Sequence, residues 1–98
     1  MTKLKSFRVE RALMKLGADI RDARKRRQIK TEIMAERLGV TRATYARLEK
    51  GDPSVSMGSY ALALNVLGKL DVLENIIDRS VDILGQDMID ARLPQRIR

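Results

Sequence analysis

Two arginines in the stretch TRATYARLEKG, residues 41–51, are the side chains of this sequence best suited to specific recognition. The guanidinium of arginine carries a planar fork of N–H donors, which matches a phosphate group or the O6 and N7 acceptors of guanine. Tyr45 and Leu48 are three residues apart, so both turn toward the same side of a helix and into a core. The outward side of that helix then holds Arg42, Ala43, Thr44, Ala46 and Arg47.

Catalytic chemistry has little support in the composition. The chain has no cysteine and no histidine, which excludes disulfides, thiolate zinc sites and the commonest general base. The carboxylates Asp78, Asp82, Asp87 and Asp90 have the spacing of a solvated face rather than of an acid–base pair or a metal site. We therefore expect a protein that is not an enzyme and that has no catalytic residue, metal or cofactor.

The sequence also lacks the marks of a membrane or secreted protein. No apolar run approaches the ~18 residues of a membrane span. The basic start MTKLKSFRVER has no apolar run of the kind found in signal peptides. These features predict a cytoplasmic location and no membrane partner.

Charge is unevenly distributed along the 98 residues, whose formal net charge is +7. Residues 1–50 hold 15 Lys/Arg and 6 Asp/Glu, a net +9, whereas residues 51–98 hold 5 and 7, a net −2. The basic half fits a polyanionic partner, although a merely solvated basic surface is the alternative. RNA or membrane-surface binding through RDARKRRQIK is less favoured, because three aromatic residues offer little base stacking and the cluster lacks a broad apolar stripe.

Apolar residues recur at helical spacing along most of the chain. This spacing predicts helices over about residues 7–27, 31–38, 42–50, 56–68 and 70–78, with Val9 and Met57 among the inward positions. Gly39 ends the second helix, and Thr41 and Ser56 supply N-caps for the third and fourth. After residue 78 we expect a tail with one or two further helical turns. The predicted fold is all-α, a compact bundle of about five helices, divided into a domain over residues 1–69 and a C-terminal helix and tail over residues 70–98.

The turn at Gly39 joins the second and third of these helices. Two short helices joined by a turn of three or four residues that contains glycine form a helix-turn-helix, which places its second helix in the major groove of DNA. Ala35 is small where the two helices cross, and Gly39 lies where a side chain would be strained. The outward alanines beside Arg42 and Arg47 let such a helix approach the base edges closely.

Two stretches of the sequence resemble known families. MAERLGVTRATYARLEKGD resembles the lambda-repressor-like, Xre-type helix-turn-helix domain, and the similarity extends over about residues 16–68. EKGDPSVSMGSYALALNVLG, together with the ending ARLPQRIR, resembles HipB-type antitoxins, which are encoded beside HipA-type kinase toxins. The first resemblance implies a DNA-binding domain, and the second implies a toxin partner.

The first resemblance also assigns roles to single residues. It implies a largely buried ion pair between Arg24 and Glu49, which orients Arg24 near a phosphate. Lys30 and Thr31 stand where the family usually has a serine cap and a glutamine, so the anchoring of a phosphate there differs in detail. The residues that would read bases are Arg42, Ala43 and Arg47, with Thr44 and Ala46. The residues that would contact phosphates are Arg24, Lys30, Thr31, Thr41, Lys50, Ser54 and Ser56.

Proteins of this type bind palindromic operators as homodimers, with recognition helices about 34 Å apart. The residues that we expect at the dimer or partner interface are Leu70, Leu73, Ile76, Ile77, Val81, Ile83 and Leu84. For Leu73 and Ile77, closure of the monomer core is an equal alternative, and the N-terminal segment with Phe7 and Val9 is another candidate interface. Residues 90–98 are either a disordered end or a peptide that orders on a partner.

The sequence therefore predicts a sequence-specific, double-stranded DNA-binding repressor. It further favours the antitoxin of a HipA/HipB-like pair, which would repress its own operon and neutralise a Ser/Thr kinase toxin. The alternatives are a stand-alone Xre-type regulator and a toxin-binding module with weak DNA binding.

Overall fold

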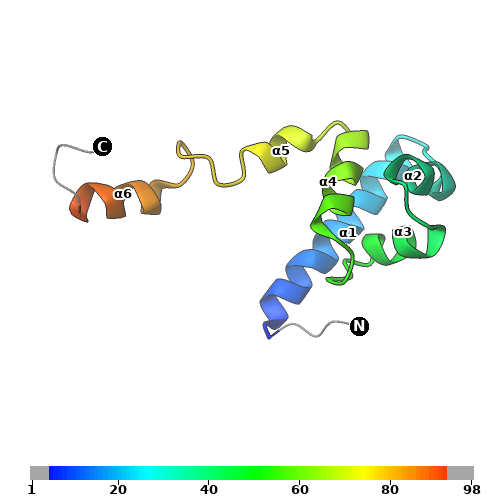
Figure 1. Ribbon diagram of the computed structural model, residues 1–98, viewed down its shortest axis with the longest axis horizontal. Coiled ribbons are helices and arrows are strands. Elements are labelled where there is room, and N and C mark those ends of the chain that lie inside the picture. The colour runs from blue at the N-terminus through cyan, green and yellow to red at the C-terminus, as the bar shows by residue number, and fades with distance from the viewer. Residues whose placement is uncertain (1–4, 93–98) are drawn as a thin grey trace.

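The computed structural model describes residues 5–92, in which every regular element is an α-helix (Figure 1). The helices are α1 (Phe7–Arg26), α2 (Thr31–Leu38), α3 (Arg42–Glu49), α4 (Met57–Val66), α5 (Leu70–Glu74) and α6 (Ile83–Arg92). The predicted all-α fold with a helix-turn-helix is therefore confirmed. None of the helices in residues 5–92 is long and apolar enough to cross a membrane.

The ends of the first four helices follow from local side-chain chemistry. Thr41 Oγ1 accepts a hydrogen bond from the Thr44 N–H at 3.1 Å, and Ser56 Oγ accepts one from the Ser59 N–H at 3.1 Å. Both caps satisfy N–H groups that have no partner inside the helix. Gly39 ends α2 in the left-handed region, with φ of 70°, where a side chain would be strained. The predicted caps and stop are confirmed.

The hydrophobic core lies between α1, α2, α3 and α4. Its buried residues are Ile20, Met34, Ala35, Leu38, Tyr45, Leu48, Val55, Tyr60, Ala63 and Leu67. Tyr45 and Leu48, the predicted inner anchors of α3, are both fully buried. Burial of this many apolar side chains, at about 1.5–3 kcal/mol for each large one, is the main force that fixes the angle of α3.

Two expected inward positions are exposed instead. Val9 is 48% exposed, because the first turns of α1 extend past the other helices of the bundle (Figure 1). Met57 is 72% exposed because it is the first residue of α4, directly after the Ser56 cap, where the chain turns away from the core. Val55 and Ala63 occupy core positions on this side of the bundle.

Helices α1 and α3 meet backbone to backbone at two glycines. A Cβ atom at Gly17 would lie 2.6 Å from the Gly51 nitrogen and 2.7 Å from the Leu48 oxygen. Gly51 has φ of 76°, and a Cβ atom there would collide with the Leu13 carbonyl. In the sequence alone, a glycine at this position would only weaken the helix. The structure shows that its missing side chain lets α1 pass directly against the end of α3.

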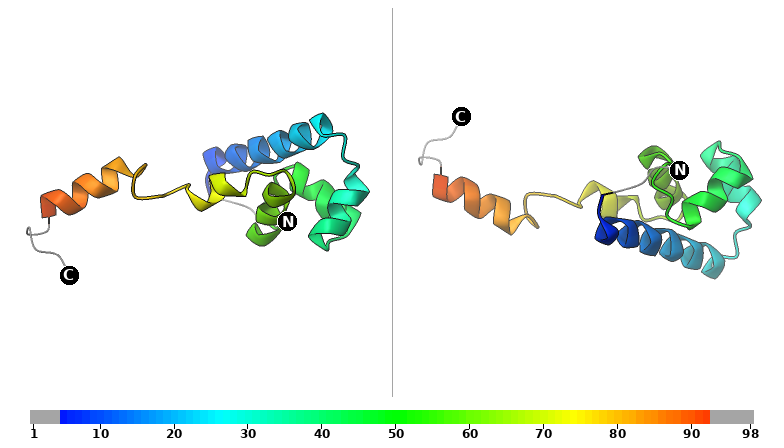
Figure 2. Two further views of the ribbon diagram at one scale, coloured as in Figure 1. Left: turned by 90° about the horizontal axis from the view of Figure 1, so that it is seen from above. Right: turned by 90° about the horizontal axis from the view of Figure 1, so that it is seen from below.

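The C-terminal part differs in detail from the expectation. Helix α5 ends at Glu74 rather than near residue 78, because Asn75 leaves the helical conformation and its side-chain amide donates to the Asp71 carbonyl at 2.8 Å. Residues 75–82 lead to α6, which is ten residues long, where only one or two turns were expected. Figures 1 and 2 show α6 well away from the bundle of α1–α5. The radius of gyration is 17.2 Å, against about 13 Å for a compact chain of 100 residues.

The apolar residues of this part are mostly exposed. Leu70 and Leu73 are half-buried, whereas Ile76, Ile77, Val81, Ile83 and Leu84 are between 60% and 74% exposed. Their role in a dimer or partner interface stays a prediction. Residues 93–98, which form most of the tail considered above for partner binding, lie outside the described residues.

Candidate nucleic-acid interface

The outer face of α3 carries the residues expected to read bases. The side chains of Arg42 and Arg47 are 72% and 51% exposed, while the opposite face of the helix is buried through Tyr45 and Leu48. The side chains of Ala43 and Ala46 are also exposed, and Thr44 is half-buried. The Thr44 hydroxyl accepts a hydrogen bond from the Thr41 hydroxyl at 3.0 Å. Thr44 and Thr41 therefore belong first to the N-terminal cap of α3.

Each outward arginine has an acidic neighbour. Arg42 Nη1 lies 3.6 Å from Glu32 Oε2 on α2, and Arg47 Nε lies 3.3 Å from Asp52 Oδ2 on the following loop. The Arg42–Glu32 pair is exposed on both sides and adds little to stability. In the Arg47–Asp52 pair only the arginine is exposed, since the aspartate side chain retains 9% of its accessible surface.

A basic hollow of about 350 Å³ lies beside α3. It is lined by Arg21, Thr31, Arg42, Ala46, Glu49 and Lys50. The hollow brings Arg42 and Lys50 together with Thr31, the first residue of α2. Helix N-termini attract anions through free N–H groups and the helix dipole. Lys30 precedes the helix and makes no side-chain cap bond. The hollow thus has the charge and the donors that a phosphate needs, and it adds Arg21, which the sequence reading missed.

Arg24 and Glu49 form a largely buried ion pair under this surface. Arg24 Nε lies 2.6 Å and Nη2 3.3 Å from the Glu49 oxygens, and the two side chains are 10% and 9% exposed. Arg24 Nη1 donates to the Ile29 carbonyl at 2.9 Å, and the Tyr45 hydroxyl donates to Glu49 at 2.5 Å. The hydrogen bond to Glu49 raises the pKa of Arg24, and burial is the main cause that raises the pKa of Tyr45. The structure thus contains the ion pair that the family resemblance implies.

This burial limits what Arg24 offers to a ligand. Three of its N–H groups already bond to acceptors inside the protein. The network joins α1 to the end of α3 and to the turn before α2. Arg24 therefore acts as part of the scaffold, and its predicted contact with a phosphate stays a prediction.

The loop between α3 and α4 carries the remaining expected phosphate contacts. Ser54 donates to Asp52 Oδ1 through its N–H at 2.8 Å and its hydroxyl at 2.7 Å. Ser56 caps α4 and also donates to the Ser59 hydroxyl at 3.1 Å. Both serines and Lys50 are exposed. They can reach a ligand, but the serine hydroxyls are already engaged in the turn.

Asp52 is a second residue of this surface, after Arg21, that the sequence did not indicate. Asp52 precedes Pro53, and such a dipeptide by itself indicates only a turn. The available signal was the spacing Arg47–Asp52, in which an arginine near the end of a helix is followed by an acid just after the glycine. Within residues 5–92, no three acidic side chains are grouped so that they could hold a metal ion.

The fold and this surface define an all-helical nucleic-acid-binding module. Residues 15–74 match the family model of the helix-turn-helix domain, so the chain belongs to the helix-turn-helix family. Membership implies DNA binding, as expected of a regulator. Searches of the curated proteins and of the solved structures gave no match.

Proposed function

We propose that the protein is a sequence-specific transcriptional repressor that binds a palindromic operator as a homodimer. The observation that carries this proposal is the position of Arg42 and Arg47 on the exposed face of α3, beside a basic hollow at the start of α2. The family membership supports this proposal, because the second helix of a helix-turn-helix commonly enters the major groove of DNA. The protein would act in the cytoplasm, without catalysis, metal or cofactor.

If α3 binds in the major groove, Arg47 and Lys50 have different roles. Arg47 would bind a guanine through two hydrogen bonds, a contact that discriminates against other bases by about 1–3 kcal/mol. Lys50 would contact a phosphate, which contributes affinity but no sequence preference.

Fluorescence anisotropy with operator and scrambled duplexes tests these tasks. Arg47→Ala should relax the preference at one base pair, whereas Lys50→Ala should weaken binding to both duplexes alike. Arg79→Ala is the matched control, since Arg79 belongs to the segment between α5 and α6. Figure 1 shows this segment away from α3. The opposite pattern for Arg47 and Lys50 would refute the assignment.

The homodimer is supported by the exposed apolar residues between Leu70 and Leu84. A dimer that neutralises about eight phosphates should give a log–log salt dependence with a slope near −7. Light scattering should give twice the chain mass. A monomeric mass at the concentrations that saturate the operator, or a salt slope near zero, would contradict this part of the proposal.

A second role is favoured by α6. This helix lies apart from the bundle and exposes Ile83, Leu84, Met88 and Ile89. With the resemblance of the ending ARLPQRIR to HipB-type antitoxins, this supports an antitoxin that binds a HipA-like Ser/Thr kinase toxin and represses their shared operon. Co-expression with a neighbouring kinase-like gene product should yield a complex that is lost on deletion of residues 90–98. DNA binding without a toxin complex would indicate a stand-alone Xre-type regulator. A toxin complex with weak DNA binding would indicate a toxin-binding interaction module.

A further inference from the structure

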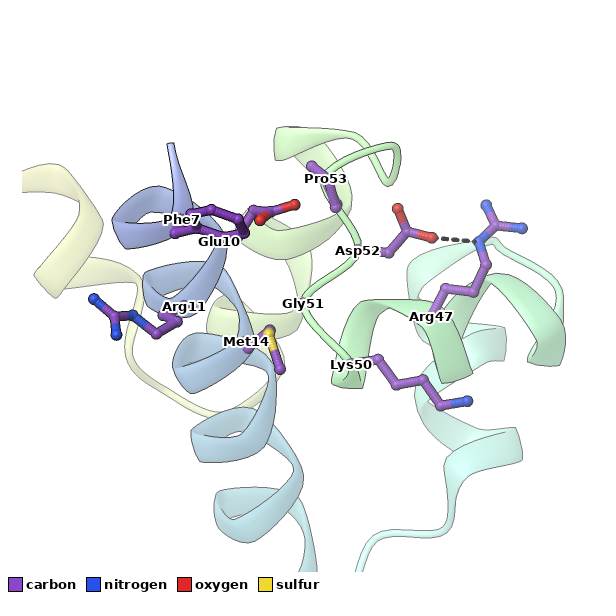
Figure 3. A pocket seen from close by; sticks show the side chains of 9 residues that line it. All are labelled: Phe7, Glu10, Arg11, Met14, Arg47, Lys50, Gly51, Asp52 and Pro53. Atoms are coloured by element: carbon purple, nitrogen blue, oxygen red, sulfur yellow. Dashed lines mark ion pairs between the residues drawn. The ribbon is translucent and has the colours of Figure 1, made fainter. Parts of the chain in front are cut away.

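We propose that Asp52 is a positioning residue for Arg47 and thereby determines which base the protein prefers. The inference rests on the DNA-binding function proposed above. Asp52 Oδ2 lies 3.3 Å from Arg47 Nε (Figure 3). A carboxylate that engages Nε leaves the outer edge of the guanidinium, with Nη1 and Nη2, pointing away from it. That edge can bind two acceptors at once, such as guanine O6 and N7.

Asp52 is itself firmly held. Its Oδ1 accepts two hydrogen bonds from Ser54, one from the N–H at 2.8 Å and one from the hydroxyl at 2.7 Å. Its own N–H donates to the Arg47 carbonyl at 3.0 Å, and its carbonyl accepts from the hydroxyl of the buried Tyr60 at 2.8 Å. The two carboxylate oxygens are thus divided between Ser54 and Arg47. The Ser54 N–H, followed by its hydroxyl, holds the pKa of Asp52 below its usual value, so the group is charged at neutral pH.

The exposed fractions of the two side chains indicate that Asp52 holds Arg47 in place, and not the reverse. The Asp52 side chain is 9% exposed and that of Arg47 is 51% exposed. Arginine is long and loses much rotamer freedom when it binds a base. A partner that fixes the side chain before DNA arrives reduces the ordering cost at the interface. The arginine is therefore prepared for one geometry of contact.

The negative charge of Asp52 has a second effect: it lowers the affinity for DNA, whereas its contact with Arg47 favours binding of one base. A carboxylate near the DNA surface repels phosphates, so it lowers affinity for every duplex. Its removal should therefore raise non-specific affinity while base discrimination falls. Loss of a residue that only stabilises the turn would have a different result. It would weaken binding to specific and scrambled DNA alike.

Asp52→Asn separates the two roles. The asparagine Oδ1 can still accept both hydrogen bonds from Ser54, so the turn is retained. Its amide nitrogen is an uncharged donor and cannot replace Oδ2 in the ion pair with Arg47 Nε. Asp78 provides a matched control, because Ser80 also donates to it through both its N–H, at 3.1 Å, and its hydroxyl, at 2.5 Å. Asp78→Asn removes the same charge from the same kind of turn, between α5 and α6.

The experiment selects binding sites from a randomised duplex library with the full chain and its variants, and measures affinity for a scrambled duplex. Asp52→Asn should lose about tenfold in preference at the base pair read by Arg47, which is the scale of one such contact. It should gain a few-fold in affinity for scrambled DNA. Asp78→Asn should keep the wild-type base preference. In an Arg47→Ala background, Asp52→Asn should cause no further loss of preference.

Two outcomes overturn the inference in distinguishable ways. If the wild type selects a sequence and Asp52→Asn keeps the same preference, the positioning role is wrong and the DNA-binding function stands. If the wild type selects no sequence, both the proposed function and this inference fail. Should Asp52→Asn unfold, Ser54→Ala replaces it. This variant keeps the charge and the backbone N–H bond but removes the hydroxyl bond to Oδ1, so the carboxylate is held less firmly. It should lose part of the preference without any gain in affinity for scrambled DNA, and an unchanged preference would again refute the positioning role.

Discussion

Replacement of Glu49 by alanine is the most direct test of the scaffold that holds α3. Glu49 accepts hydrogen bonds from Arg24 Nε, Arg24 Nη2 and the Tyr45 hydroxyl. Without it, Arg24 keeps only the Ile29 carbonyl of these contacts, with its side chain 10% exposed. An uncompensated buried charge costs about 3–5 kcal/mol. A domain of this size has about 5–15 kcal/mol of stability, so Glu49→Ala should remove a large part of it.

Urea denaturation followed by circular dichroism measures this cost. At about 4–8 °C for each kcal/mol, the midpoint of thermal unfolding should also fall by more than about 10 °C. Glu36→Ala, at an exposed position of α2, is the control and should change little. The double replacement Arg24→Met with Glu49→Leu should recover part of the loss, because an apolar pair leaves no charge uncompensated. The recovery is incomplete because the buried Tyr45 hydroxyl loses its acceptor. A loss below about 0.5 kcal/mol for Glu49→Ala would refute the reasoning, since exposed pairs cost that little.

Two further predictions concern the glycines and the pH dependence. Gly17→Ala should destabilise the fold by more than Gly39→Ala in the same denaturation assay. A Cβ atom at Gly17 meets backbone at 2.6 Å, whereas Gly39 has open space and only the strain of its positive φ, about 1–2 kcal/mol. Equal losses would argue against the close crossing of α1 and α3. For Tyr45, burial and then Glu49 raise the pKa of the phenol, so the folded state favours the neutral form. The stability that this provides is complete below the ordinary tyrosine pKa of about 10 and is lost as the pH rises above it. Tyr45→Phe should reduce this loss of stability at alkaline pH. An unchanged dependence of the free energy of unfolding on pH would contradict a link between folding and the ionisation of Tyr45.

The positions of the first three helices could be predicted closely because their ends depend on local chemistry. Thr41 caps its own helix, and Gly39 adopts the backbone conformation that ends one. These effects involve residues within one turn of each other. The inward direction of Tyr45 and Leu48 follows from helical spacing alone.

The features that the sequence did not predict depend on contacts between residues that are far apart in the sequence. Gly17 meets Gly51 only because α1 crosses the end of α3, and nothing near Gly17 in the sequence indicates that crossing. Asp52 faces Arg47 only because Gly51 turns the chain back, with φ of 76°. The exposure of Val9 and Met57 likewise depends on where neighbouring helices end, which periodicity does not report.

The contact of backbone with backbone at Gly17 and Gly51 limits how far α1 and α3 can move relative to each other. At this crossing there is no side chain whose replacement by a smaller one would let the two helices approach further. If α3 binds bases as proposed, exchange of its exposed residues, such as Ala43 and Ala46, is therefore the simplest route to a new DNA preference, because it leaves the crossing unchanged.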